Sequence, residues 1–114
     1  MIRAAFAARI PVGACCIAPA LLGLIAKASS TKLKLTSGNV PETAKTLVSM
    51  GHVHIDKPVD EIVVDVDRKV VTTPAYMYDD AAIDAVARGI DKMVKQVVDW
   101  SREELSAPRN APNR

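Results

Sequence analysis

The chain has 114 residues, which is enough for one small domain with a core of its own. Its 15 basic and 13 acidic residues leave a net charge of +2 that is spread along the chain, which argues against a nucleic-acid partner. The two cysteines, Cys15 and Cys16, are neighbours, so they exclude a disulfide framework and favour a reducing compartment. No apolar run reaches the roughly 18–20 residues of a membrane span, so we expect no membrane partner either.

The N-terminal ten residues predict an amphipathic helix. Ile2, Ala5, Phe6 and Ile10 share one side of it, and Pro11 stops it. The same segment contains arginine and no acid, like the start of a mitochondrial transit peptide, but it runs into Pro11 without a spacer. We favour the helix, and a chain that opens in mid-helix suggests a missing N-terminal portion.

A short strand and a helix follow without a loop between them. Val12–Cys15 is apolar and rich in small residues, which is typical of a strand buried on both faces of a parallel sheet. A helix over 17–26 comes next, with Pro19 near its start and apolar residues at helical spacing (Leu21, Leu22, Leu24 and Ile25).

The middle of the chain alternates strands and helices. We predict a strand over 33–36, a helix that begins at Pro41 and ends near Gly51, and a short strand over 53–55. Two β-rich runs, 62–66 and 69–73, are separated by Asp67-Arg68 and predict a hairpin. The acidic residues there, Asp60, Glu61, Asp65 and Asp67, are interpreted as a solvated strand edge.

The last helix is expected to be capped by Asp79 or Asp80. Ion pairs four residues apart, Asp84–Arg88 and Asp91–Lys95, are predicted on its outer face, and Gly89 suggests close packing. Its apolar face comprises Ile83, Val86, Ile90, Met93, Val94 and Val97. Residues 1–102 are predicted to form the domain, and residues 103–114 have the composition of a disordered tail.

This order of elements predicts an α/β fold with a largely parallel but half-built sheet. The direct passage from strand to helix has the geometry of a nucleophile elbow, in which the turn residue lies strained above the carboxyl ends of the strands. Cys16 is that residue if the strand ends at Cys15. Its sulfur would then lie at a helix N-terminus, where free N–H groups favour a thiolate.

Three segments resemble a known family. Residues 16–22 (CIAPALL), 50–77 (MGHVHIDKPVDEIVVDVDRKVVTTPAYM) and 89–98 (GIDKMVKQVV) are similar to the ElbB type of the PfpI/ThiJ superfamily, which is related to class I glutamine amidotransferase domains. The resemblance implies a partial flavodoxin-like three-layer sandwich that lacks its N-terminal half. The ElbB-type members are glyoxalase-like proteins, once linked to isoprenoid biosynthesis, with mitochondrial relatives in eukaryotes.

By this resemblance Cys16 is the elbow cysteine, and Cys15 is a small buried residue on the other side of the strand. The chain departs from the catalytic members at Ile17, where these often have a histidine. The Glu that the superfamily places beside the cysteine is also absent, as are the strands that should flank Val12–Cys15. We interpret the chain as a fragment, or as a protein that assembles with something that completes its sheet.

The remaining candidate residues keep two interpretations each. His54 could be a base for Cys16, and with His52 it could begin a metal site, but we favour structural histidines and expect no metal. In the resembling family, residues at and after the strand 69–73 border the pocket, so Thr73 could contact a carbonyl ligand. Alternatively, Thr73 and Pro74 simply end a strand. The predicted substrate pocket is Ile17, Ala18, Thr73 and Pro74.

The resemblance implies a cofactor-independent, glyoxalase-like activity on small dicarbonyls, with Cys16 as nucleophile and weak or absent turnover. The alternative is a non-catalytic, redox-sensing or assembly protein on the same fold. Open sheet edges predict a homo-oligomer. We expect a mitochondrial location, with the cytoplasm as the alternative.

Overall fold

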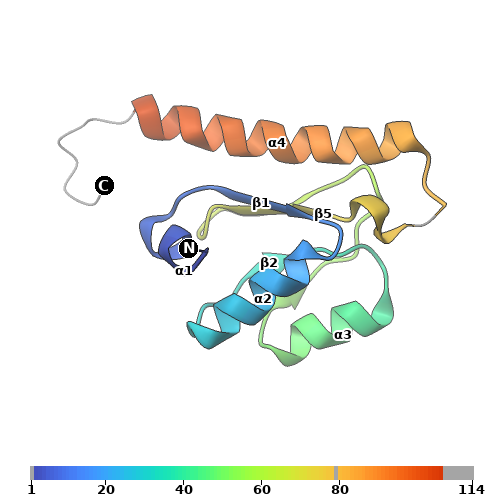
Figure 1. Ribbon diagram of the computed structural model, residues 1–114, viewed down its shortest axis with the longest axis horizontal. Coiled ribbons are helices and arrows are strands. Elements are labelled where there is room, and N and C mark those ends of the chain that lie inside the picture. The colour runs from blue at the N-terminus through green and yellow to red at the C-terminus, as the bar shows by residue number, and fades with distance from the viewer. Residues whose placement is uncertain (1, 79, 107–114) are drawn as a thin grey trace.

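Two small strand ladders organise the computed structural model, which describes residues 2–78 and 80–106 (Figure 1). The first ladder has the order β1-β5-β4. In it β1 (Val12–Cys15) runs parallel to β5 (Val70–Thr73), while β4 (Val63–Asp65) runs antiparallel to β5. The predicted hairpin is therefore confirmed, and the strand before the elbow has the predicted bounds.

The second ladder pairs β2 (Lys34–Leu35) with β3 (Val53–His54) in parallel. It is joined to the β4–β5 hairpin through side chains. The Lys34 N–H donates to Asp65 Oδ2 at 2.9 Å, and the Thr36 N–H donates to Thr72 Oγ1 at 2.9 Å. Asp65 is buried and also accepts the Arg68 N–H, so the interpretation of this residue as a solvated edge acid is wrong.

Helices cover the first ladder on both sides (Figure 1). Helix α4 (Ile83–Ser106) lies on one face, and α2 (Ala18–Ala28), α3 (Pro41–Ser49) and the second ladder lie toward the other. Helix α1 (Ile2–Ala8) precedes β1 and packs against α2. The α/β class predicted from the sequence is confirmed.

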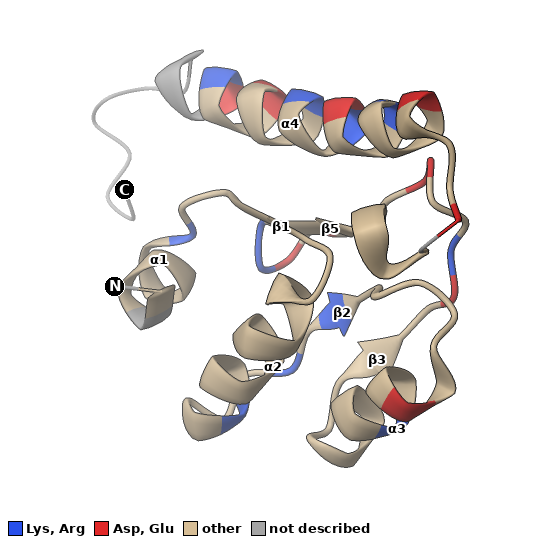
Figure 2. Ribbon diagram, turned by 45° about the vertical axis from the view of Figure 1, so that its right-hand side comes forward, with Lys and Arg blue, Asp and Glu red and all other residues tan. Residues whose placement is uncertain are grey.

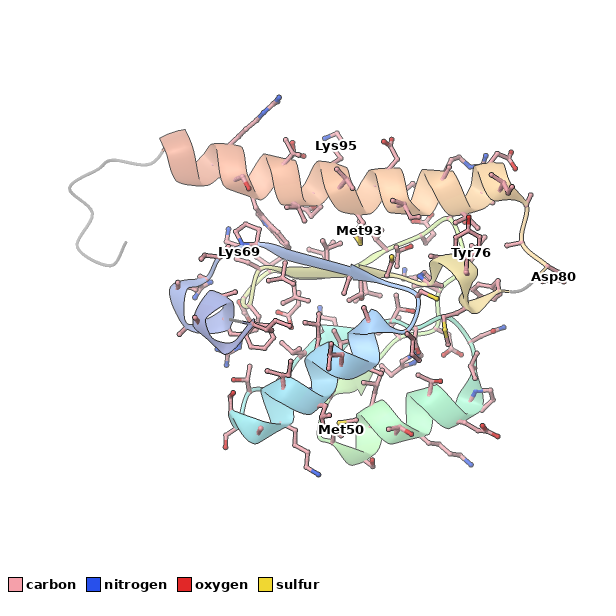
Figure 3. The ribbon with its side chains drawn as sticks, viewed as in Figure 1. Met50, Lys69, Tyr76, Asp80, Met93 and Lys95 are labelled. Atoms are coloured by element: carbon pink, nitrogen blue, oxygen red, sulfur yellow. The ribbon has the colours of Figure 1, made fainter. Side chains whose placement is uncertain are left out.

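The alternation of side chains along β1 and β5 assigns residues to the two faces. Ala14 and Val70 belong to the core on the α2 side, whose other buried members are Phe6, Leu22, Ala26, Leu33, Leu35 and Leu47. Gly13 faces α4, where an added Cβ would lie 3.2 Å from Met93 Cγ and from Val97 Cγ2. Figure 3 shows Met93 reaching from α4 toward the strands.

At Gly89, α4 approaches the rest of the fold closely. A Cβ at this position would lie 2.4 Å from the Val59 carbonyl oxygen and 2.8 Å from Thr73 Oγ1. Real Cβ atoms do not approach backbone atoms so closely, so only glycine at this position allows α4 to lie this near the Val59 carbonyl oxygen. This confirms the close packing expected from a glycine inside a helix.

Several details of the helices differ from expectation. Helix α4 begins at Ile83, after Asp80, and its backbone is helical to Ser106, beyond the boundary expected at residue 102; Asp79 and residues 107–114 lie outside the described residues. The Asp84–Arg88 pair is present, whereas Lys95 pairs with Asp99 instead of Asp91. Ile10 lies beyond the end of α1 with 54% of its surface exposed, so the prediction that it shares one side of this helix with Ile2, Ala5 and Phe6 is wrong.

The apolar faces predicted for α2 and α4 are only partly buried. Leu22 and Val86 are in the interior, but Leu21, Leu24, Ile83 and Val94 are exposed. Within the described residues, no helix is both long enough and apolar enough to cross a membrane.

Candidate active site

Cys16 lies at the turn that joins β1 to α2. Its φ is 61°, in the left-handed region, and its N–H donates to the Thr73 carbonyl oxygen at 3.2 Å. For a residue with a Cβ this conformation costs about 1–2 kcal/mol, and such strain concentrates at functional sites. Cys16 is half-buried and belongs to neither the strand nor the helix. This is the elbow geometry that the sequence predicted.

Five non-glycine residues have a positive φ (Arg9, Cys16, Ser30, Lys69 and Ala75), and one of them lies at the end of the strand next to β1. Ala75 has φ 48° and opens the 3-10 turn η1 (Ala75–Met77) directly after β5. The register pairs Cys15 with Thr73, so Cys16 and Ala75 both follow the carboxyl ends of adjacent parallel strands. In α/β folds, ligands bind at these strand ends.

The start of α2 offers unused amide groups beside Cys16. Ile17 occupies the N-cap position without a side-chain cap, and Pro19 in the first turn has no N–H. Among the described residues, the amides of Ile17 and Ala18 donate to no acceptor. Amides at a helix N-terminus stabilise negative charge, so they suit a thiolate or an oxyanion at this turn.

Cys15 differs from its neighbour in its surroundings. It lies in β1, where alternation puts it on the same face as Gly13. Burial, and then the proximity of Cys16, raise the pKa of the Cys15 thiol above its ordinary value. Both cysteines are free thiols.

Thr73 and Pro74, at and after the end of β5, are buried in the interior. The Thr73 hydroxyl donates to the Glu61 carbonyl oxygen at 2.7 Å and is fully buried, so it is not open to a ligand as we had predicted. Pro74 is fully buried as well. Of the predicted pocket residues, Ile17 is exposed and Ala18 is half-buried, so the accessible part of the pocket lies on the α2 side.

A hollow of about 200 Å³ lies next to Ile17, the residue that follows Cys16, although Cys16 itself is not among its lining residues. It is lined by Ile17 before α2, by Ala20 from α2, and by Glu42, Thr43 and Thr46 from α3. Glu42, in the first turn of α3, brings a carboxylate to the side of Ile17. The sequence showed Glu42 only as a residue at a helix start, because nothing local indicates which helix α3 lies against.

A larger hollow of about 580 Å³ lies after β2 and β3, with Asn39, Asp56, Lys57, Tyr78 and Asp80 among its lining residues. The Tyr78 hydroxyl donates to the Lys57 carbonyl oxygen at 2.5 Å. Burial, and then Asp56, raise the pKa of Tyr78, so the phenol stays protonated. As in the smaller hollow, no cysteine or histidine is among the lining residues, and none of them is a sequence neighbour of Cys16.

The two histidines are engaged in the scaffold. His52 is buried; its Nδ1 accepts the Leu33 N–H at 3.0 Å, and its Nε2 lies 2.7 Å from the Gly23 carbonyl oxygen. His54 Nε2 accepts the Ser37 N–H at 3.2 Å, and Nδ1 lies 3.4 Å from Asp56 Oδ1.

Both ring nitrogens of His54 are thus directed to partners other than Cys16, so the idea of a base at this position finds no support. The part of the chain that the structure describes holds no cluster of three or more His, Cys, Asp or Glu side chains that could bind a metal.

Three comparisons relate the chain to known proteins. No protein-family model matches it. The ES1 protein homolog, mitochondrial, of Rattus norvegicus is 36% identical over 101 residues, which are 81% of this chain and 36% of the rat protein. The glutamine amidotransferase-like class 1 domain-containing protein 3, mitochondrial, of Homo sapiens is 35% identical over 98 residues, which are 78% of this chain and 35% of the human protein.

A solved structure also matches. The isoprenoid biosynthesis protein with amidotransferase-like domain from Ehrlichia chaffeensis superimposes with a TM-score of 0.79 at 30% identity, over 88% of this chain and 45% of that one. The chain spans about a third of the length of the two curated relatives and less than half of the solved structure.

Proposed function

The chain belongs to the ES1 and class 1 glutamine amidotransferase-like family and has its flavodoxin-like fold, and we propose that Cys16 is its functional nucleophile. The chain matches about a third of the length of the two curated relatives. The observation that carries this proposal is the positive φ of Cys16, directly before a helix whose first amides are unused. The substrate class that suits an unassisted thiolate is a small, highly electrophilic dicarbonyl such as glyoxal.

In the proposed reaction, the Cys16 sulfur adds to one aldehyde carbon and forms a carbon–sulfur bond, and the carbonyl oxygen becomes an oxyanion. The amide after an elbow nucleophile stabilises such an oxyanion, and Ile17 supplies this amide here. Protonation gives a hemithioacetal. The exposed side chain of Ile17 leaves this side of the turn open to a small molecule.

The hemithioacetal then isomerises. The hydrogen on the sulfur-bearing carbon leaves as a proton, and a proton returns to the adjacent carbon, giving a thioester of glycolate. Water cleaves the thioester and regenerates the thiol, so that glyoxal and water become glycolate with no external oxidant, reductant or cofactor. Glu42 lines the hollow beside Ile17, and we assign to its carboxylate the movement of this proton.

We expect turnover to be slow. Ile17 cannot accept a proton, and neither His52 nor His54 hydrogen-bonds Cys16 within the described residues. Activation of the thiol therefore depends on the N-terminus of α2. A general base that removes the thiol proton commonly contributes about 10²–10⁴-fold, and this contribution is missing here, because Glu42 is assigned only to the later transfer of the carbon-bound proton.

Glycolate formation from glyoxal by the purified full chain tests the proposal. The wild type and Cys15→Ser should form glycolate slowly at similar rates, Cys16→Ser should form none, and Glu42→Gln should be several-fold slower. Equal activity of wild type and Cys16→Ser would refute the assignment of Cys16.

A redox-sensing or assembly protein on the same fold is the second candidate, because Cys16 is a half-buried thiol at a helix start with no base bonded to it. After peroxide treatment, a dimedone adduct at Cys16 without any glycolate formation would favour this role. The names of both curated relatives include "mitochondrial", so we propose a mitochondrial location, with the cytoplasm as alternative. Immunofluorescence with a mitochondrial marker tests it.

A further inference from the structure

A hollow of about 500 Å³ lies at the opposite end of the strands from Cys16. Cys16 follows the carboxyl end of β1, whereas this hollow lies at the amino ends of β1, β2, β3 and β5. Its lining residues are Arg9 before β1, residues 32–34 at the start of β2, Val53 at the start of β3, and Asp65, Asp67 and Arg68 at the end of β4 and in the turn before β5. The hollow is therefore separate from the candidate active site.

Hydrogen bonds within the described chain hold the walls of this hollow together. The Lys34 N–H donates to Asp65 Oδ2 at 2.9 Å, which joins β2 to the β4–β5 hairpin. The Val53 N–H donates to the Leu33 carbonyl oxygen at 2.9 Å, which joins β3 to β2. Among the described residues that line the hollow, none belongs to β1, so its shape does not depend on what lies beside that strand.

Four exposed basic side chains line the hollow: Arg9, Lys32, Lys34 and Arg68. Figure 2 shows basic residues on β2 and in the segment between α1 and β1. The ion pairs found among the described residues all involve other side chains. Four cations from three separate segments therefore border one space without a carboxylate partner of their own.

Two carboxylates also line the hollow, and they differ in their surroundings. Asp65 is buried and accepts two backbone N–H groups, from Lys34 at 2.9 Å and from Arg68 at 3.1 Å. These bonds engage both of its oxygens, so this carboxylate holds the wall of the hollow. Asp67 is exposed. Four cations and two carboxylates give the lining a charge of +2.

We propose that this hollow binds a small molecule through a phosphate monoester group. Such a group carries about −1.5 to −2 charges at pH 7, which matches the charge of the lining. Its three free oxygens point in different directions, and the basic residues likewise come from three segments. Arg9 and Arg68 can each hold two of the oxygens with a planar guanidinium group. The volume lies within the range of about 300–1,000 Å³ that is typical of small-molecule sites.

Two apolar residues of the lining accommodate the organic part of the ligand. Leu33 is buried, and Val53 is 43% exposed at the start of β3. A monocarboxylate of similar size carries a single charge on a planar group, so it leaves part of the lining charge unmatched. We therefore expect the hollow to prefer phosphate monoesters over monocarboxylates.

Isothermal titration calorimetry of the full chain tests this proposal, with phenyl phosphate as the probe and benzoate as a comparison that has the same ring. In about 0.15 M salt, which screens long-range attraction between exposed charges, phenyl phosphate should bind at least about tenfold more tightly than benzoate. Equal binding of the two anions, or no binding of phenyl phosphate at millimolar concentrations, would overturn the proposal.

Charge-matched variants locate the site. Lys34→Gln/Arg68→Gln removes two of the four cations and should weaken phenyl phosphate binding at least about tenfold. Lys45→Gln/Arg102→Gln is the control and should bind like the wild type, because it removes the same charge from exposed residues of α3 and α4 outside the hollow. Asp67→Asn should bind several-fold more tightly, a gain that a damaged fold does not produce. Equal affinities of the two double variants, or an Asp67→Asn variant that binds no more tightly than the wild type, would contradict this site.

Amide chemical shifts during the same titration separate this hollow from the start of α2, where unused amides could also attract an anion. Phenyl phosphate should shift the amides of residues 32–34 and 65–68 and leave those of Cys16 and Ile17 unchanged. Cys16→Ser should bind the probe like the wild type, so this inference and the nucleophile proposal can fail independently. Shifts confined to Cys16 and Ile17 would overturn the assignment of the hollow.

Discussion

The positive φ of Cys16 predicts which of two variants at this position is more stable, and the opposite order is expected at the neighbouring Cys15. Glycine adopts a positive φ without the Cβ clash, so Cys16→Gly should be more stable than Cys16→Ala. The strain relieved is about 1–2 kcal/mol, and the extra entropy of glycine in the unfolded chain costs about 0.5–1 kcal/mol. The net expectation is a Gly variant more stable by about 0.5–1 kcal/mol.

The matched control is the same pair of substitutions at Cys15. This residue lies in a regular strand opposite Thr73, where glycine has no conformational advantage. Cys15→Gly should therefore be less stable than Cys15→Ala by about 0.5–1 kcal/mol. Urea unfolding of the four variants at one protein concentration, followed by the fluorescence of buried Trp100, gives both differences. A free energy of unfolding of Cys16→Ala that equals or exceeds that of Cys16→Gly would refute the elbow conformation.

Three further predictions concern the scaffold. Gly89→Ala should lower the free energy of unfolding by about 1–3 kcal/mol in urea, although alanine favours helix by about 1 kcal/mol, because its Cβ would meet the Val59 carbonyl; an unchanged midpoint would contradict the close approach. His52→Phe should cost about 2–3 kcal/mol in the same assay, since it leaves the Leu33 N–H and the Gly23 carbonyl unpaired, and no loss would show that neither bond matters. Because the pKa of Cys15 in the folded chain is raised above 9.0, the unfolded chain loses this thiol proton at a lower pH than the folded chain does. The contribution of Cys15 to the free energy of unfolding should therefore be complete below pH 9 and decline above it, and the decline should be smaller in Cys15→Ala. Equal declines in the two proteins would contradict the raised pKa.

The sequence predicted those elements that are determined by residues close together in the chain. The strand over Val12–Cys15, the β4–β5 hairpin and the abrupt turn at Cys16 followed from apolar runs, turn residues and the absence of a loop. Gly89 was interpreted correctly as a point of close packing, because a glycine inside a helix otherwise has only a cost.

Features that depend on tertiary contacts were missed. The burial of Asp65 could not be read from its neighbours, because one of its two N–H donors, at Lys34, comes from 31 residues away. The Thr73 hydroxyl was assigned to the pocket, but whether it faces the elbow or α4 depends on which side of β5 the helix covers. Glu42 entered the candidate site only through the packing of α3 beside α2.

The exposed stripes on α2 and α4 show a limit of a different kind. The periodicity of Leu21, Leu24, Ile83 and Val94 indicates faces that avoid water. It does not say which surface covers these side chains, and in the described residues they are exposed.

The reactivity of Cys16 relative to Cys15 tests the central claim most directly. Iodoacetamide alkylation of the folded chain, followed by mass spectrometry between pH 6 and pH 10, compares Cys15→Ser, which retains Cys16, with Cys16→Ser, which retains Cys15. We predict that Cys16 is alkylated at neutral pH, while Cys15 reacts only at alkaline pH or on unfolding. Equal rates at the two positions, or a Cys16 that reacts only when the chain unfolds, would contradict an accessible nucleophile at the turn between β1 and α2.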